Sequence, residues 1–226
     1  MPEPVTAAVV SLFLGNLLGE PIREGAGWLT DIIHEQRLRR LGVFLQEYEN
    51  LRLKLGISGL RPVPPKLAIP ILNAASIEDE GYVTKRYACL LANFSNPQYH
   101  GEMTPAFQQL LASMSPLDLR LLTEAYRIVV ESGPDNSDAD HISSRAYFWV
   151  TAKSLSDRTG LDLQCVLPNL ENLERLRCLV ANEHETHYYA SDPMNRNYRW
   201  TPTSFHITPL GELLLLTCDE DFVKRS

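Results

Sequence analysis

The chain has 226 residues and carries 28 acidic against 21 basic side chains, which gives a formal charge of −7. Its hydrophobic content of 44% and charged content of 22% are typical of globular proteins, so a disordered chain, a collagen-like fibre and a disulfide-dense miniprotein are excluded. The length fits one medium domain with an appendage, or two small domains. The acidic balance argues against a protein that mainly coats duplex nucleic acid, because that task needs clustered Lys and Arg.

The cysteines are widely spaced and form no CxxC pair. Three of them lie in apolar runs, where a thiol behaves as a small buried hydrophobe. We therefore expect reduced cysteines in a cytoplasmic protein. The first six residues lack the positive charge of a signal peptide, and we expect none. The cysteines are Cys89, Cys165, Cys178 and Cys218.

Residues 5–18 form the most hydrophobic stretch of the chain. The stretch is shorter than the roughly 20 residues of a membrane-spanning helix. Gly15 and Gly19 have the GxxxG spacing that lets helices approach closely in lipid. Three interpretations stay open: a helix packed on the fold or on another subunit, a membrane-associated segment, and a frayed end.

Between residues 34 and 55, leucines and Tyr48 recur at three- and four-residue steps, which predicts one amphipathic helix. Gly56 and Gly59 end it, and a proline-rich connector follows. The other face of this helix is basic, which is typical of a solvated face and also suits a partner or nucleic acid. The nucleic-acid candidates on it are Arg37, Arg39 and Arg40.

More helices are predicted up to residue 131, and no strand. A short apolar helix over residues 66–75 contains Pro70. Ser76 is then expected to cap a helix that ends near Asn93, with the acids at 78–80 complementing the helix dipole. A hydroxyl followed by proline, at 104–105 and at 115–116, marks two further helix starts.

The runs 62–97 and 103–122 resemble the Abi-alpha family of bacterial abortive-infection proteins. This resemblance implies a role in defence against phage, and it supplies no catalytic residues. The residues that carry it are equally interpretable as helix caps and core. They are Glu78, Asn93 in the LLAN run, Pro105, Ser115, Pro116 and Asp118.

The pattern changes after an acidic linker at 132–141. A short helix over 154–161 ends at Gly160, and a second helix begins at Asp162. Strands are expected after residue 178, at 186–189 and at 204–207, and Thr208 caps a closing helix over 210–218. This order is typical of a winged helix-turn-helix.

Polar side chains on the second helix and in the wing are candidates for DNA contacts. Against DNA binding, residues 142–217 hold seven basic and eight acidic side chains, and Pro168 removes a backbone donor within the helix. A winged helix without positive excess more often mediates protein contacts or dimerisation. The candidates are Gln164, Asn172, Arg175, Arg196 and Arg199.

No catalytic motif is recognised: the chain has no Gly-rich phosphate loop, no GxSxG and no HExxH. His184 and His187 form an HxxH without a third ligand in view, so we expect neither a metal nor a cofactor.

The sequence thus predicts a mainly α fold, a helical bundle followed by a small winged helix-turn-helix-like α/β module. The expected domains are 1–131 and 142–226, joined by the linker. The predicted function is abortive-infection phage defence through macromolecular interactions, with a protein partner or self-association. The alternatives are a winged-helix DNA-binding regulator and a membrane-associated effector that uses residues 5–18.

Overall fold

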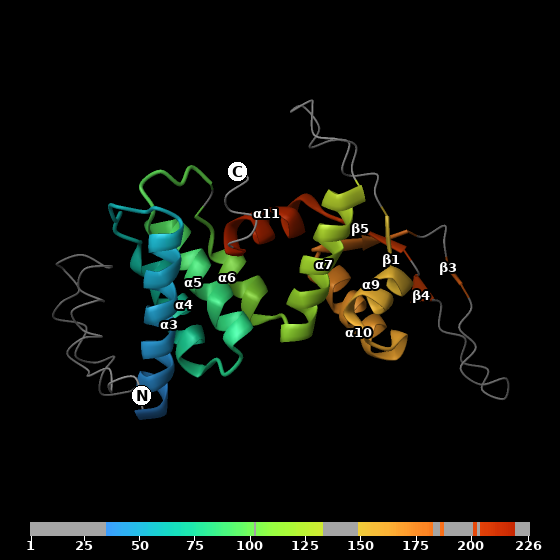
Figure 1. The fold of residues 1–226 in the computed structure, drawn as a ribbon, viewed down its shortest axis with the longest axis horizontal. Helices are drawn as coiled ribbons and strands as arrows, with labels where there is room; N and C mark the ends of the chain where they lie inside the picture. Colours follow the sequence, from blue (N-terminus) through green and yellow to red (C-terminus); the bar gives the residue numbers. More distant parts are fainter. Residues whose placement is uncertain are drawn as a thin grey trace. The chain divides into compact units, whose positions relative to one another are not determined.

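The structure is a computed structural model, and it describes residues 35–101, 103–132, 149–182, 186–187, 201–202 and 204–219. Figure 1 shows the fold. Within these residues there are eight helices and one three-stranded antiparallel sheet, so the predicted mainly α fold is confirmed. The hydrophobic segment 5–18, the linker 132–141 and the wing residues Arg196 and Arg199 lie outside the described residues, apart from Ser132.

The contacts divide the chain into two compact units. The first unit contains Met1–Ala112 together with Leu215–Ser226, and the second contains Ser113–Leu214. Helix α7 (Pro116–Ser132), which the sequence analysis placed in the helical domain, belongs to the second unit. The first unit is therefore built from two stretches that are distant in the sequence.

Helix α3 (Glu35–Lys54) packs on α4 (Pro65–Ile77) and on α5 (Gly81–Ser95) in the first unit. Four of the predicted core positions are buried: Leu41, Leu45, Tyr48 and Leu51. Leu38 and Leu55 are half-buried, and Leu53 is exposed. The Tyr48 hydroxyl lies 2.9 Å from Ser95 Oγ on α5. Helix α6 (Pro105–Ala112) packs on α4 and α5. Burial of one apolar stripe per helix supplies most of the stabilisation of such a bundle.

One expected helix boundary was wrong. Ser76 lies in the last turn of α4 and donates its hydroxyl to Asn73 O at 2.7 Å, so it does not cap α5. The carboxylate of Glu78 accepts the backbone N–H groups of Asp79 and Glu80 at 3.0 and 2.9 Å. Both N–H groups precede α5, whose N-cap residue is Glu80 and has no side-chain cap bond. The expected hydroxyl cap is therefore not formed, and α4 instead continues two residues beyond Ala75, the end that the sequence predicted.

In the second unit, β1 (Val150–Thr151), β5 (Ser204–Ile207) and β2 (Leu179–Ala181) form the sheet in the order β1-β5-β2. Helices α9 (Ala152–Thr159) and α10 (Leu163–Arg175) lie between β1 and β2 in the chain, and α10 packs on both α7 and α9. A separate antiparallel pair joins β3 (Thr186–His187) to β4 (Thr201–Pro202).

Local signals placed the ends of these elements. Thr151 Oγ1 accepts the backbone N–H of Ser154 at 3.0 Å at the start of α9, and Gly160 ends that helix in the left-handed region with φ of 70°. The strand expected at 204–207 matches β5. Pro168 lies inside α10, as its position in the sequence indicated.

Helix α11 (Pro209–Cys218) begins in the second unit, and its residues from Leu215 onward belong to the first. Its start is tied to the short segment between α10 and β2. The Thr208 hydroxyl donates to Arg177 O at 2.6 Å and accepts the backbone N–H of Gly211 at 3.0 Å. Gly211 lies directly against the backbone of Cys178, since a Cβ there would be 3.1 Å from the Cys178 carbonyl carbon and closer still to its oxygen.

None of the helices in the described ranges combines the length and the apolar character that a membrane crossing requires.

Gly211→Ala should lower the free energy of unfolding by about 1–3 kcal/mol, because the new methyl group would force apart backbone that cannot move cheaply. Chemical denaturation measures this effect. The matched control is Gly81→Ala, where a Cβ meets no atom within 4 Å. The control should change stability by less than about 1 kcal/mol. Equal effects of the two substitutions would contradict the packing described for α11.

Candidate functional site

The basic residues of α3 differ in how the fold uses them. Arg40 donates to Ile77 O at 2.9 Å and forms an ion pair with Asp79, so it closes the C-terminal end of α4. A cation is favourable there because the last carbonyls of a helix carry partial negative charge. Arg39 is exposed and Arg37 is half-buried. The three arginines therefore do not form one equivalent basic surface.

Asn93, one of the residues that carry the family resemblance, is buried in the first unit. Its amide donates to Thr217 O at 2.6 Å, near the end of α11. The Tyr99 hydroxyl lies 3.2 Å from Thr217 Oγ1. These bonds join α5 and the residues that follow it to a segment more than a hundred positions later, so Asn93 has a structural task.

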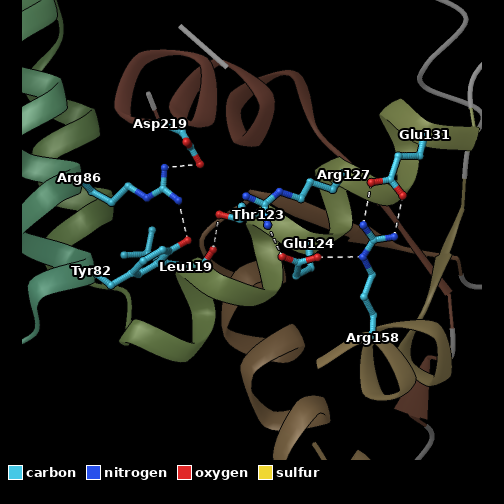
Figure 2. Close-up of polar contacts among 9 residues, drawn as sticks. All are labelled: Tyr82, Arg86, Leu119, Thr123, Glu124, Arg127, Glu131, Arg158 and Asp219. Atoms are coloured by element: carbon cyan, nitrogen blue, oxygen red, sulfur yellow. Dashed lines mark hydrogen bonds and ion pairs between the residues drawn. The ribbon is translucent and has the colours of Figure 1, made fainter. Parts of the chain in front are cut away.

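A buried ion pair that the sequence analysis did not foresee lies beside this contact. Arg86 on α5 pairs with Asp219, and both side chains are more than nine-tenths buried. Arg86 also donates to the Tyr82 hydroxyl at 2.5 Å and lies over the Tyr82 ring, 4.7 Å from its centre (Figure 2). Burial alone would lower the pKa of Arg86, but Tyr82 and Asp219 outweigh burial and raise it. No local pattern announces this pair because its members are remote in sequence.

Pro105 begins α6, and the hydroxyl of Thr104 accepts the backbone N–H of Ala106 at 3.2 Å. The start of α7 is closed reciprocally by Ser115 and Asp118. Asp118 Oδ2 accepts the Ser115 backbone N–H at 2.7 Å, and Ser115 Oγ accepts the Asp118 backbone N–H at 3.0 Å. This is a capping box with Asp in the place of Glu, followed by Pro116 as the first helical residue.

Side chains of α10 form hydrogen bonds with these capping residues of α7. Asn172 donates to Asp118 Oδ2 at 2.8 Å, and Arg175 donates twice to Asn172 Oδ1, at 3.1 and 2.7 Å. Ser115 Oγ also donates to Asn169 Oδ1 at 3.2 Å. We call this group the α7–α10 polar cluster; its members are Ser115, Asp118, Asn169, Asn172 and Arg175.

The cluster contains a buried carboxyl group. Asp118 is 2% exposed, and its second oxygen, Oδ1, has no hydrogen-bond partner within the described ranges. Burial raises the pKa of the Cys178 thiol to about 12, and the Asp118 carboxylate adds to that rise. Asn172 and Arg175, two candidates for DNA contacts, therefore make bonds inside the second unit. Gln164, the third candidate on α10, is exposed.

A second network in the second unit lies on its surface. Arg158 on α9 donates to both carboxylate oxygens of Glu131 at 2.7 Å and to Glu124 at 2.9 Å, and Arg127 donates to Glu124 at 2.6 Å (Figure 2). The hydrogen bonds from Arg158 lower the pKa of Glu131. The side chains lie on α7 and α9, so the network joins these two helices.

No group of three or more His, Cys, Asp or Glu residues that could hold a metal ion occurs in the part of the chain that the structure describes. His184 of the HxxH pattern lies outside that part.

The chain is thus a mainly α protein of two units. The polar groups described above chiefly join its helices to one another. The chain belongs to the abortive infection alpha family, whose model matches residues 36–218. The family assigns it to abortive-infection defence against phage. Searches of curated proteins and of solved structures give no significant match.

Asp118→Ala and Asn172→Ala should each lower the free energy of unfolding by about 1–3 kcal/mol, because each leaves buried polar groups without partners. Their effects should be strongly non-additive in a double-mutant cycle, since both remove one shared bond. Gln164→Ala, at an exposed position of the same helix, should change stability by less than about 0.5 kcal/mol. Additive effects would mean that the cluster does not join α7 to α10.

Thiol accessibility gives a separate test. Cys165 is exposed, whereas Cys89, Cys178 and Cys218 are buried. Burial raises the pKa of Cys178 to about 12 and raises that of Cys218 well above its usual range, so both remain protonated and unreactive near neutral pH. A thiol reagent at pH 8 should modify one cysteine in the native protein and all four after unfolding. Cys165→Ser should abolish the native reaction, and a native count above one would contradict this burial pattern.

Proposed function

We propose that this chain acts in phage defence as a binding protein, and that its second unit is a winged-helix-like module used for protein contacts. The chain order α7, β1, α9, α10, β2, β5 and the sheet order β1-β5-β2 support the winged-helix assignment. We choose a protein partner over DNA because the polar side chains of α10 already form bonds within the second unit. A helix that reads DNA presents free polar side chains to the groove.

On α10, those side chains have other bonds. Asn172 holds Asp118, Arg175 holds Asn172, and Asn169 accepts from Ser115. Contact with a base edge would require breaking bonds that stabilise the start of α7. The exposed positions toward the N-terminal half of the helix are Gln164, Cys165 and Pro168, and none of them is a cation that could neutralise a phosphate.

A row of three neighbouring side chains crosses the sheet, and it suits a protein partner better than α10 suits DNA. The row consists of Val180, His206 and Trp149. His206 on the central strand β5 is paired in register with Val180 on β2. On its other side, the ring of Trp149 meets the His206 ring edge-on, with ring centres 4.9 Å apart. Trp149 is 42% exposed and Val180 36% exposed. Partly exposed aromatic residues on a rigid sheet are typical anchors of protein interfaces.

A DNA-binding regulator is the second candidate, and the topology of the second unit favours it. Arg175 and Arg177 are exposed near the C-terminal end of α10. If DNA is the partner, the bonds of the polar cluster must open on binding, and duplex binding should depend on Arg175.

Trp149→Ala should weaken capture of a protein partner from phage-infected cells by about 30-fold, and it should reduce protection in a phage plating assay. Leu60→Ala, which truncates a side chain of nearly equal exposure (40%) on the first unit, is the matched control and should retain both. Thermal unfolding of each variant separates loss of binding from loss of fold.

The two candidates separate in a band-shift assay at low salt. We expect no specific duplex binding and no effect of Arg175→Ala. Tight duplex binding lost in Arg175→Ala, with protection lost in parallel, would overturn the protein-contact proposal in favour of DNA. Unchanged plating of a broad phage panel on cells that express the intact protein would count against defence as a whole.

A further inference from the structure

The outward face of α3 carries a regular stripe that the core does not use. The stripe advances along the helix by alternating steps of four and three residues, and all of its members are exposed. Leu53 is 70% exposed and Val43 56%, and no other large hydrophobic residue in the described ranges is as exposed as these two. The members of the stripe are Arg39, Val43, Gln46, Asn50 and Leu53.

These alternating steps are the spacing of the inner positions of a two-stranded coiled coil. The inner positions are of two kinds. In parallel dimers, β-branched residues are favoured at the first kind and leucine at the second. A single Asn at the first kind of position specifies the register of the helices and their pairing as a dimer. Val43 and Asn50 occupy the first kind of position. Leu53 occupies the second, together with the polar residues Arg39 and Gln46. The residues that α3 buries in its own unit, such as Phe44, lie on the opposite face.

We propose that α3 pairs with α3 of a second copy of the chain, in parallel and in register, through this stripe. Each inner residue then meets its own copy. Asn50 meets Asn50, and the two amides can bond across the twofold axis as donor and acceptor. A self-complementary surface of this kind is what a twofold dimer requires.

Charge on the flanks of the stripe decides the direction of the pair. In the parallel arrangement, Glu49 of one copy lies next to Lys54 of the other, which is attractive. In the antiparallel arrangement that brings Val43 opposite Leu53, Glu47 faces Glu47 and Glu49 faces Glu49. The antiparallel arrangement thus has two like-charge contacts, whereas the parallel arrangement has one, between the two copies of Arg39 at the N-terminal end of the stripe. Like charges in these positions are unfavourable, so the parallel pair is preferred. Glu49 also accepts a hydrogen bond from Arg52 of its own helix at 2.9 Å, on the side away from the stripe, and pairing with Lys54 of the other copy would compete with this bond.

The energetics favour a weak but specific contact. A free peptide of this length would have to form its helix before pairing, but α3 is already held by α4 and α5. Association therefore does not include that ordering cost. The stripe spans about two heptads, less than a standard interface of about 1,600 Å². We expect a dissociation constant in the micromolar range. This pairing does not depend on the function proposed for the second unit.

Sedimentation equilibrium of the full chain should show a reversible monomer–dimer equilibrium. Leu53→Glu should raise the dissociation constant by at least about tenfold, because it places two carboxylates against each other across the axis. Leu60→Glu, an exposed leucine outside the stripe, is the matched control and should leave the constant unchanged. Lys54→Glu should weaken the dimer, and adding Glu49→Lys should restore it.

Cysteine cross-linking tests the direction, in a Cys165→Ser background that removes the exposed native thiol. Leu53→Cys should form a disulfide with its own copy under mild oxidation by glutathione disulfide, which takes up the two thiol hydrogens and leaves as two glutathione thiols. Asn73→Cys, exposed on α4, should not. Cross-linking of Val43→Cys only with Leu53→Cys in a mixture would overturn the parallel pair.

Two other outcomes would overturn the proposal. The first is a monomer at every concentration up to about 100 μM, well above the expected micromolar constant. The second is a monomer that binds nucleic acid through this face, recognised by loss of binding in Arg39→Ala and Lys54→Ala.

Discussion

The first unit depends on one constraint: the segment from Leu215 onward must pack against α5. The segment from Leu215 onward belongs to this unit although the whole second unit separates it from Ala112. Two polar contacts hold it: Asn93 bonds Thr217 O, and Arg86 pairs with Asp219. Both lie in the interior, where a polar group without a partner is costly. Loss of either partner would leave a buried polar group without its bond, so substitution at either contact should destabilise the first unit.

A comparable arrangement organises the second unit. The Asp118 carboxylate caps α7 and receives Asn172 from α10, so one buried group sets both the start of a helix and the packing of its neighbour. This has a functional consequence. A side chain that closes a buried centre must break its bonds before it can contact a ligand. The two proposed recognition surfaces are therefore ones that the fold leaves open: the row containing Trp149 and the stripe on α3.

Membership of the abortive infection alpha family gives these surfaces their biological setting. A weak self-association through α3 would respond to protein concentration, while a contact through the sheet would respond to a partner. The family residues Glu78, Asn93 and Asp118 all serve the architecture that presents these surfaces.

Much of the fold is determined locally, and the sequence alone predicts it. Helical spacing of leucines predicted α3, hydroxyl and proline pairs predicted the starts of α6 and α7, and Gly160 predicted the end of α9. Each of these signals acts within one or two turns, which is the range of backbone hydrogen bonding and capping. The exception, Ser76, shows the limit: the sequence pattern indicates a cap, but α4 continues through this residue and buries its side chain.

The use of particular side chains was decided only by tertiary structure. The sequence alone indicates that Asn172 and Arg175 are polar residues on a helix, but not that Asp118 lies opposite them. It likewise cannot reveal that Asp219 meets Arg86, because that contact depends on how the chain closes and not on spacing. Hydrogen bonds and ion pairs have a reach of a few ångströms, so their partners exist only once the elements are packed. Sequence therefore determined the elements and the family, and packing determined which residues remain available for function.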